Sequence, residues 1–336
     1  MKRLFVLIFF CCITSLFLLQ VSRAHISAPA ASVLRVMCLP TRPLALTVAL
    51  EQGLFAKHGV DVQAQIAANS EELRSALAGG TIDLAHAAVD NAVALAEKAH
   101  VDVVVVMGGE GSTNELIAQP LIHSVPDLRG RTMIVDAPTT AYAIQLKKIL
   151  LLNGLQASRD YQIKAVGSTP LRLSSMRENK EYAASILGPP TSLIAKHEGF
   201  VSLGTTQQFL GPYQGIGAFV RRAWAKENRN LLTSYIAASI EAQRWIMDPA
   251  HKERVTALLE KEFHLSSDLA REAYDSWIVA PGGLEADSRI NLEGFRNVLR
   301  LRAEIEHTWS EETPGPEKYY DPSYYDAALS TLSPAK

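Results

Sequence analysis

Residues 33–80 constrain the fold most, because strand-like and helix-like patterns alternate along this segment. Residues 33–39 form a short apolar run that is typical of a buried strand, and residues 60–66 alternate apolar and polar as a second strand does. Pro43 suits the first position of the helix between them, since proline lacks only an N–H that has no partner there. Another helix is expected after the second strand. This order predicts an α/β domain with a parallel sheet.

Length and composition set the broad class of protein. The chain has 336 residues, which is enough for about two domains. Hydrophobic residues make up 48% and charged residues 20%, as in folded globular proteins. The formal net charge is −2 and no basic stripe is visible, so nucleic-acid binding has no electrostatic support.

The apolar runs continue along the chain at intervals that suit an α/β fold. Extended segments at residues 115–118 and 214–220 are expected to cross between two lobes, and the chain is expected to be helical from residue 223 onward. A terminal aromatic cluster at residues 319–325 is expected to dock the C-terminus onto the first lobe. Further strands are predicted at residues 82–88, 101–107, 132–135, 161–166 and 182–187.

An ordered series of motifs carries a family resemblance. EQGLFAKHGVDV at residues 51–62 and LAGGTIDLA at residues 77–85 resemble the opening of solute-binding proteins of ABC importers. The similar branch binds alkanesulfonates, taurine, nitrate or the thiamine pyrimidine precursor. The resemblance reaches about residue 203 and includes DLRGR at residues 127–131, where Arg131 replaces the family's lysine. Tyr182 departs from it, since the family often has Asp-Ala where this chain has Tyr-Ala.

The resemblance implies a two-lobed α/β fold of the periplasmic-binding-protein type, similar to type II. Residues 33–114 with 218–332 would form the first lobe, and residues 115–217 the second. The solute would bind in the cleft between the lobes, which would close around it as a hinge.

The loops that follow the predicted strands are candidates for the binding site. Ligands of open parallel sheets bind beyond the carboxyl ends of the strands, where helix N-termini offer free N–H groups. Taken singly, the amide and hydroxyl residues of these loops serve equally well as helix caps; as a converging set they favour binding. The candidates are Thr41, Arg42, Asn69, Ser70, Asp90, Asn91, Thr139, Thr140, Gly188 and Pro189.

Asp90 is the most informative candidate, because many relatives have a small or hydroxyl residue there. A buried carboxylate is costly unless it has a partner. Three interpretations remain open: Asp90 pairs with Arg42, it contacts a donor group of the ligand, or it caps the helix that it begins. Contact with the ligand would favour an amine, an amidine or an N–H-bearing ring over a simple anion.

Catalytic and cofactor motifs are absent from the sequence. It has no Gly-x-Ser-x-Gly, Walker, Gly-x-Gly-x-x-Gly or His-Glu-x-x-His pattern, and its nine histidines are scattered. We therefore expect no enzyme activity, no cofactor and no metal. The expected partners of this monomer are a small molecule and a membrane ABC permease. Two alternatives remain: a periplasmic sensor module that regulates a membrane kinase, and an enzyme of the thiamine-pyrimidine type, whose cysteine cluster this chain lacks.

The N-terminus has the pattern of a secretory signal peptide at residues 1–24. Lys2 and Arg3 precede an apolar stretch at residues 4–21, and Ser22-Arg23-Ala24 is an acceptable cleavage site. The stretch is also nearly long enough to remain as a membrane anchor. Both interpretations place the rest of the chain in the periplasm.

Cleavage of this leader is the first testable prediction. Mass spectrometry of protein recovered from the periplasm should find His25 or a close neighbour at the N-terminus. Recovery of the intact chain in the membrane fraction would favour the anchor instead.

Overall fold

The computed structural model describes residues 32–333, except residue 41. The predicted leader and its cleavage site lie outside the described residues. Within the described part, no helix combines the length and the apolarity that a membrane span needs.

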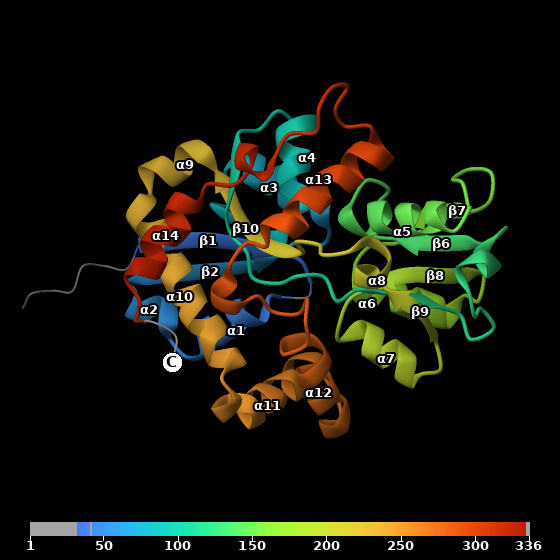
Figure 1. Cartoon of the computed structure of the whole chain (residues 1–336). Coiled ribbons are helices and arrows are strands. Elements are labelled where there is room, and N and C mark those ends of the chain that lie inside the picture. Colours follow the sequence, from blue (N-terminus) through green and yellow to red (C-terminus); the bar gives the residue numbers. More distant parts are fainter. Residues whose placement is uncertain (1–31, 41, 334–336) are drawn as a thin grey trace, which may run out of the picture. The chain divides into compact units, whose positions relative to one another are not determined.

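The first sheet contains five strands in the order β2-β1-β3-β10-β4 (Figure 1). β1 pairs in parallel with β2 and with β3, whereas β10 is antiparallel to β3 and to β4. The bounds of these strands are Ser32–Cys38 (β1), Val60–Ile66 (β2), Leu84–Ala88 (β3), Val103–Met107 (β4) and Ile216–Arg221 (β10).

Side chains of β1 alternate between the two faces of this sheet, as the period of a strand requires. Leu34 and Val36 belong to the apolar cluster that contains α1 (Leu44–Glu51) and α10 (Arg229–Met247). Met37 belongs to the cluster on the other face, with α3 (Ser70–Gly79) and α4 (Asp90–Lys98). Helices therefore cover both faces, which leaves the ends of the strands as the accessible edges.

The second sheet has the order β7-β6-β8-β5-β9. Here β5 is the antiparallel strand, between β8 and β9. In each sheet, the antiparallel strand is the first strand that the chain forms after it arrives from the other sheet. The strands are Glu115–Ala118 (β5), Thr132–Val135 (β6), Gln162–Ala165 (β7), Tyr182–Leu187 (β8) and Val201–Thr205 (β9). The helices between them are α5 (Ala141–Leu152), α6 (Thr169–Glu178), α7 (Thr191–His197) and α8 (Thr206–Leu210).

Four strands have the bounds that the sequence predicts: β2, β5, β6 and β8. β9 and α8 were not predicted, because Gly204 interrupts a run of only a few apolar residues. The predicted capping role of Asp90 is wrong: Val89 is the N-cap of α4, and Asp90 is its first residue. The division into lobes at residues 115 and 217 stays a prediction.

The chain beyond β10 is helical, as predicted, and returns to the first sheet. Its helices are α9 (Arg222–Glu227), α10, α11 (Lys252–Phe263), α12 (Ser267–Ala273), α13 (Leu292–Glu306) and α14 (Pro322–Ser330). The Val105 N–H of β4 donates to the Tyr319 carbonyl at 2.8 Å, and the Asp321 N–H donates to the Val105 carbonyl at 3.2 Å. The aromatic C-terminal segment thus docks beside β4, which confirms the expected role of this cluster.

The expected crossings at residues 115–118 and 214–220 are misplaced, because residues 115–118 form β5 within the second sheet and residues 216–221 form β10 within the first. The two segments that connect the sheets precede these strands and run against each other at Gly111 and Gly215. The Gly215 N–H donates to the Glu110 carbonyl at 3.1 Å. A Cβ atom on Gly215 would lie 2.0 Å from the Gly111 carbonyl oxygen, well inside contact distance. This approach of two backbones requires glycine.

Gly215→Ala should therefore lower the free energy of unfolding by about 1–3 kcal/mol, because the backbones must separate to admit the methyl group. Urea denaturation measures the change. Gly79→Ala is the matched control: a Cβ atom there meets nothing within 4 Å, so stability should stay the same or rise slightly. Equal stability of the two variants would contradict the predicted crowding.

Candidate functional site

Three adjoining cavities lie where strands of the two sheets end. The largest has a volume of about 390 Å³, and two smaller ones have volumes of about 70 Å³ and 50 Å³. Arg42 lines both the 390 Å³ and the 50 Å³ cavity, and Tyr142, Thr169 and Ile216 line both smaller ones. The cavities therefore form one continuous candidate site, which loops of both sheets line together.

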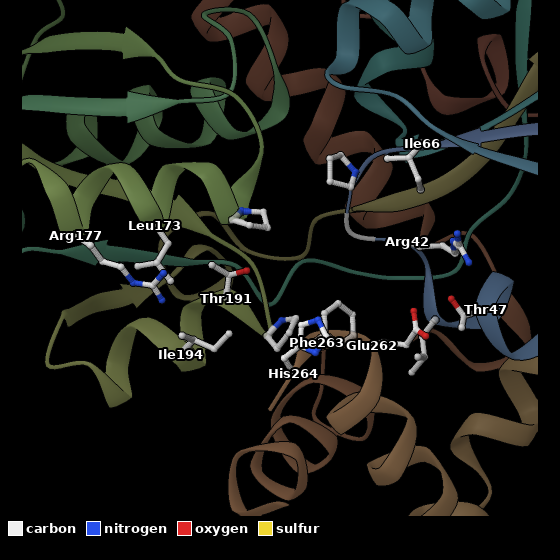
Figure 2. Close-up of a pocket in the computed structure, with 14 residues that line it drawn as sticks. Arg42, Thr47, Ile66, Leu173, Arg177, Thr191, Ile194, Glu262, Phe263 and His264 are labelled. Carbon is white, nitrogen blue, oxygen red and sulfur yellow. The ribbon is translucent and has the colours of Figure 1, made fainter. Parts of the chain in front are cut away.

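The largest cavity is the outer part of this site (Figure 2). Thr191 and Ile194 come from the start of α7, and Arg42 and Thr47 come from the loop and helix after β1. Figure 2 shows Phe263 and His264, at the end of α11, between these two sides. The lining is mostly apolar, with a few polar groups that can orient a ligand.

Several predicted residues do line the cavities. Asn69 and Ser70 face the 70 Å³ cavity, and Gly188 and Pro189 face the 50 Å³ cavity together with Arg42. The Arg42 Nε atom is buried and has no hydrogen-bond partner among the described residues. Asn69 also caps α3, because its side chain accepts from the N–H groups of Glu71 and Glu72. Thr41 lies outside the described residues. That these groups bind a ligand remains a prediction.

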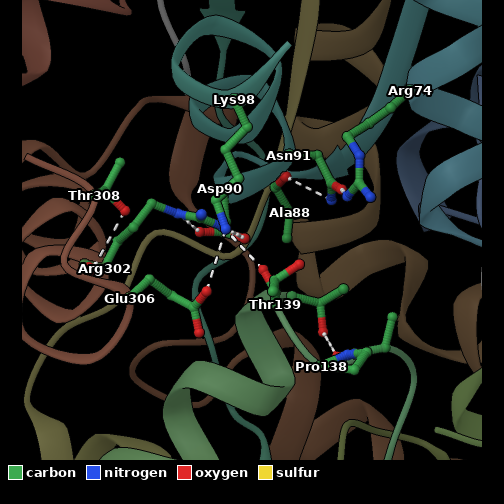
Figure 3. Close-up of polar contacts among 12 residues, drawn as sticks. Arg74, Ala88, Asp90, Asn91, Lys98, Pro138, Thr139, Arg302, Glu306 and Thr308 are labelled. Carbon is green, nitrogen blue, oxygen red and sulfur yellow. Dashed lines mark hydrogen bonds and ion pairs between the residues drawn. The ribbon is translucent and has the colours of Figure 1, made fainter.

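Asp90 has a partner that the sequence analysis did not consider. The two Asp90 carboxylate oxygens accept from Arg302 Nε and Nη2 of α13, at 2.8 and 2.7 Å (Figure 3). The side chains are 2% and 0% exposed. Arg302 Nη2 also donates to the Thr139 carbonyl at 3.1 Å. Pairing of Asp90 with Arg42, one of the three interpretations left open, is therefore wrong, and a bidentate ion pair with Arg302 occupies the carboxylate instead.

The remaining candidates are also engaged by protein groups. Asn91 accepts from Arg74 Nη1 at 2.8 Å and donates to the Ala88 carbonyl at 3.2 Å (Figure 3). Thr140 donates through Oγ1 to Asp136 and to the Ala137 carbonyl. These contacts stabilise the loops after β3 and β6, and the loop after β6 lines the 70 Å³ cavity through Asp136.

The inner part of the site contains residues that the sequence analysis missed. Arg172 of α6 is fully buried and donates to Ser185 Oγ at 3.0 Å and to the Thr169 hydroxyl at 3.1 Å. Its guanidinium stands 4.7 Å from the centre of the Tyr142 ring. Burial raises the pKa of Asp136, and the positive charge of Arg172 opposes that rise. A fixed cation, a hydroxyl and an aromatic ring thus meet at the 70 Å³ cavity.

Glu110 is the other residue that the sequence analysis did not assign to the site. It lines the 50 Å³ cavity, where its Oε1 atom accepts from Trp277 Nε1 at 3.2 Å. Burial raises the pKa of Glu110 to about 7, although the Trp277 hydrogen bond opposes the shift. Its one sequence signal is the glycines at 108, 109 and 111 around it, which favour a flexible loop. Among residues 32–333, apart from residue 41, no cluster of three metal-ligating side chains is present.

Comparison with known proteins fits this geometry. Residues 37–260 match the model of the NMT1-like family. The chain belongs to the NMT1-like family. The match covers more than half of the chain, and it confirms the family resemblance that the motifs of residues 51–62 and 77–85 indicated.

Solved structures share the fold of this NMT1-like chain at low sequence identity. The nitrate-binding protein NrtA of Synechocystis PCC 6803 is 15% identical, with 91% of this chain and 90% of NrtA covered, at a TM-score of 0.75. The alkanesulfonate-binding protein SsuA of Xanthomonas axonopodis pv. citri, bound to MOPS, is 13% identical, with 88% and 100% covered, at a TM-score of 0.70. The predicted two-lobed periplasmic-binding-protein fold is thereby confirmed.

Two further similarities are to proteins of other kinds. The bicarbonate transport ATP-binding protein CmpC of Synechocystis sp. is 23% identical over 254 residues, which span 70% of this chain but only 37% of CmpC. The desulfurization enzyme DSZB is 14% identical, with 89% of this chain and 99% of DSZB covered, at a TM-score of 0.63. Neighbours of the NMT1-like chain are mostly binding proteins, and one is an enzyme.

The Asp90–Arg302 pair generates a stability prediction. Asp90→Asn leaves the Arg302 charge buried without its counter-ion, so the free energy of unfolding should fall by about 3–5 kcal/mol. Asp102→Asn is the matched control: the Asp102 side chain is 73% exposed beside Arg222, and its loss should cost less than about 1 kcal/mol.

Urea denaturation of both variants measures these changes. The double variant Asp90→Asn with Arg302→Met should recover part of the loss, because it removes the stranded charge as well. If Asp90→Asn were as stable as Asp102→Asn, the pair would not be the buried interaction described above.

Proposed function

We propose that this chain is the extracytoplasmic solute-binding component of an ABC importer. It captures a small polar molecule in the periplasm and presents it to a membrane permease. The observation that carries the proposal is the continuous site lined by loops of both sheets, with Arg42 on one side and Thr169 and Gly188 on the other. A solute held by both sides can bring them together.

The chemistry of the site supports binding without catalysis. Arg172 is held by hydrogen bonds to Ser185 and Thr169, which suits it to orient a ligand. The names of the neighbours NrtA and SsuA describe nitrate-binding and alkanesulfonate-binding proteins. We infer that the chain makes and breaks no bond in its solute, and that it works as a monomer.

A thermal-shift screen tests the binding proposal. Purified mature protein is melted with nitrate, sulfonates, pyrimidines, amino acids and aromatic acids, each in excess. A solute that binds the folded state raises the melting temperature by mass action. At a concentration one hundred times its Kd, it raises the free energy of unfolding by about 2.7 kcal/mol. No shift with any class would contradict solute capture, and conversion of a binding compound to a product would show an enzyme.

Closure on the solute is a separate prediction. The segments that connect the two sheets and meet at Gly111 and Gly215 would act as the hinge, so small-angle scattering should give a smaller radius of gyration with the best compound from the screen. The forward scattering in the same experiment should give the mass of one chain. An unchanged radius at saturation would count against a closing receptor.

A further inference from the structure

The position of Glu110 in the site is fixed by its backbone. The Glu110 N–H donates to the Ile216 carbonyl at 3.3 Å, and the Glu110 carbonyl accepts from Gly215 at 3.1 Å. The side chain therefore projects from the place where the two connecting segments meet. It lines the 50 Å³ cavity with Arg42, Tyr142 and Trp277.

The Glu110 carboxylate lacks a cationic partner. Within the described chain, its one hydrogen bond is the one from Trp277 Nε1 to Oε1, at 3.2 Å, and no arginine, lysine or histidine forms an ion pair with it. Asp90, in contrast, has both carboxylate oxygens bonded to Arg302. Glu110 is half-buried, and among the described residues no group donates to its Oε2 atom. This oxygen is therefore open to a donor group of a ligand in the cavity.

The neighbours of Glu110 indicate what this group is. Trp277 and Tyr142 bring aromatic rings to the same cavity, and rings of this kind attract cations and stack on flat heterocycles. Resting on the function proposed above, we propose that the solute carries a nitrogen donor, an amine, an amidine or an N–H-bearing ring, that pairs with Glu110. Arg42, whose Nε has no partner among the described residues, then faces an oxygen acceptor of the same solute.

Other titratable groups around Glu110 do not change charge near neutral pH. Burial lowers the pKa of His86, which lines the next cavity with Glu110, to about 4, so His86 is neutral. Burial raises the pKa of Tyr142, so its phenol keeps its proton. The Arg42 guanidinium stays positive. Between pH 6 and 8, Glu110 is therefore the group of this cavity whose charge changes, with a pKa of about 7.

The experiment compares two halves of one panel by thermal shift and calorimetry on the mature chain. Benzamidine, phenethylamine and 4-aminopyrimidine carry nitrogen donors; benzoate, benzenesulfonate and nitrate carry only acceptors. We expect the nitrogen donors to bind more tightly. For benzamidine, which stays cationic, affinity should rise about tenfold from pH 6 to pH 8, because Glu110 must give up its proton to pair with it.

Glu110→Gln isolates the carboxylate, since glutamine has the same shape and can still accept from Trp277. It should weaken benzamidine binding about ten- to a hundredfold and remove the pH dependence. Glu311→Gln, an exposed change of the same type, should leave both unchanged. If Glu110→Gln does not fold, the pH dependence of the unmodified chain still tests the proposal.

The outcomes separate this inference from the function that it rests on. Tighter binding of the acceptor-only half, or benzamidine affinity that is the same in Glu110→Gln and at both pH values, would overturn the nitrogen-donor class and leave solute binding intact. If no compound of either half binds, solute capture itself fails and the inference fails with it. Preferential, Glu110-dependent binding of nitrogen donors supports both.

Discussion

The arrangement of this chain depends on one buried ion pair, Asp90 with Arg302. Both side chains are inaccessible to water, so each charge is tolerable only because the other is in place. The pair joins the first turn of α4 to α13, and Arg302 reaches further, to the Thr139 carbonyl before α5. Glu306, one turn along α13, adds ion pairs to Lys98 and Lys147. The C-terminal region is thereby tied to helices that flank both sheets (Figure 3).

The contacts between the two sheets differ in strength between the α13 side and the side where α7 meets α12. On the α13 side, the Asp90–Arg302 pair is buried, and α13 shares an apolar cluster with α5. Between α7 and α12, His197 Nε2 and Glu272 Oε2 form a hydrogen bond at 2.8 Å, with side chains 55% and 45% exposed. An exposed pair of this kind contributes little to stability, whereas breaking a buried one is costly. A hinge motion in the proposed receptor would therefore open the α7–α12 side and keep the α13 side as its pivot.

The sequence predicts the positions of strands and loops better than it predicts which distant side chains pair with each other. Apolar runs located β6 and β8 because the burial of a strand is visible in its own residues. The loops after the predicted strands followed from topology, and Arg42, Asn69 and Gly188, after β1, β2 and β8, do line the cavities. The partner of Asp90, Arg302, lies 212 residues away in the sequence, and no local sequence pattern predicts a pairing over that distance. Trp277 lies in the region that was expected to be helical, and the spacing of apolar residues does not tell whether a ring nitrogen meets a carboxylate.

The same reasoning limits what the fold says about the solute. A fold that hosts nitrate-binding and alkanesulfonate-binding proteins supplies a cleft and a set of helix N-termini, and the side chains at the cleft decide the ligand. Two carboxylates follow strands of the first sheet in this chain. Arg302 cancels the charge of Asp90, so Asp90 adds nothing to the field in the cleft. Within the described chain, the Glu110 carboxylate accepts one hydrogen bond, from the Trp277 N–H. Above its pKa it is therefore a negative charge that lines the same small cavity as the positive charge of Arg42. A simple anion meets repulsion from Glu110 there, whereas a solute with donors at one end and acceptors at the other satisfies both side chains at once.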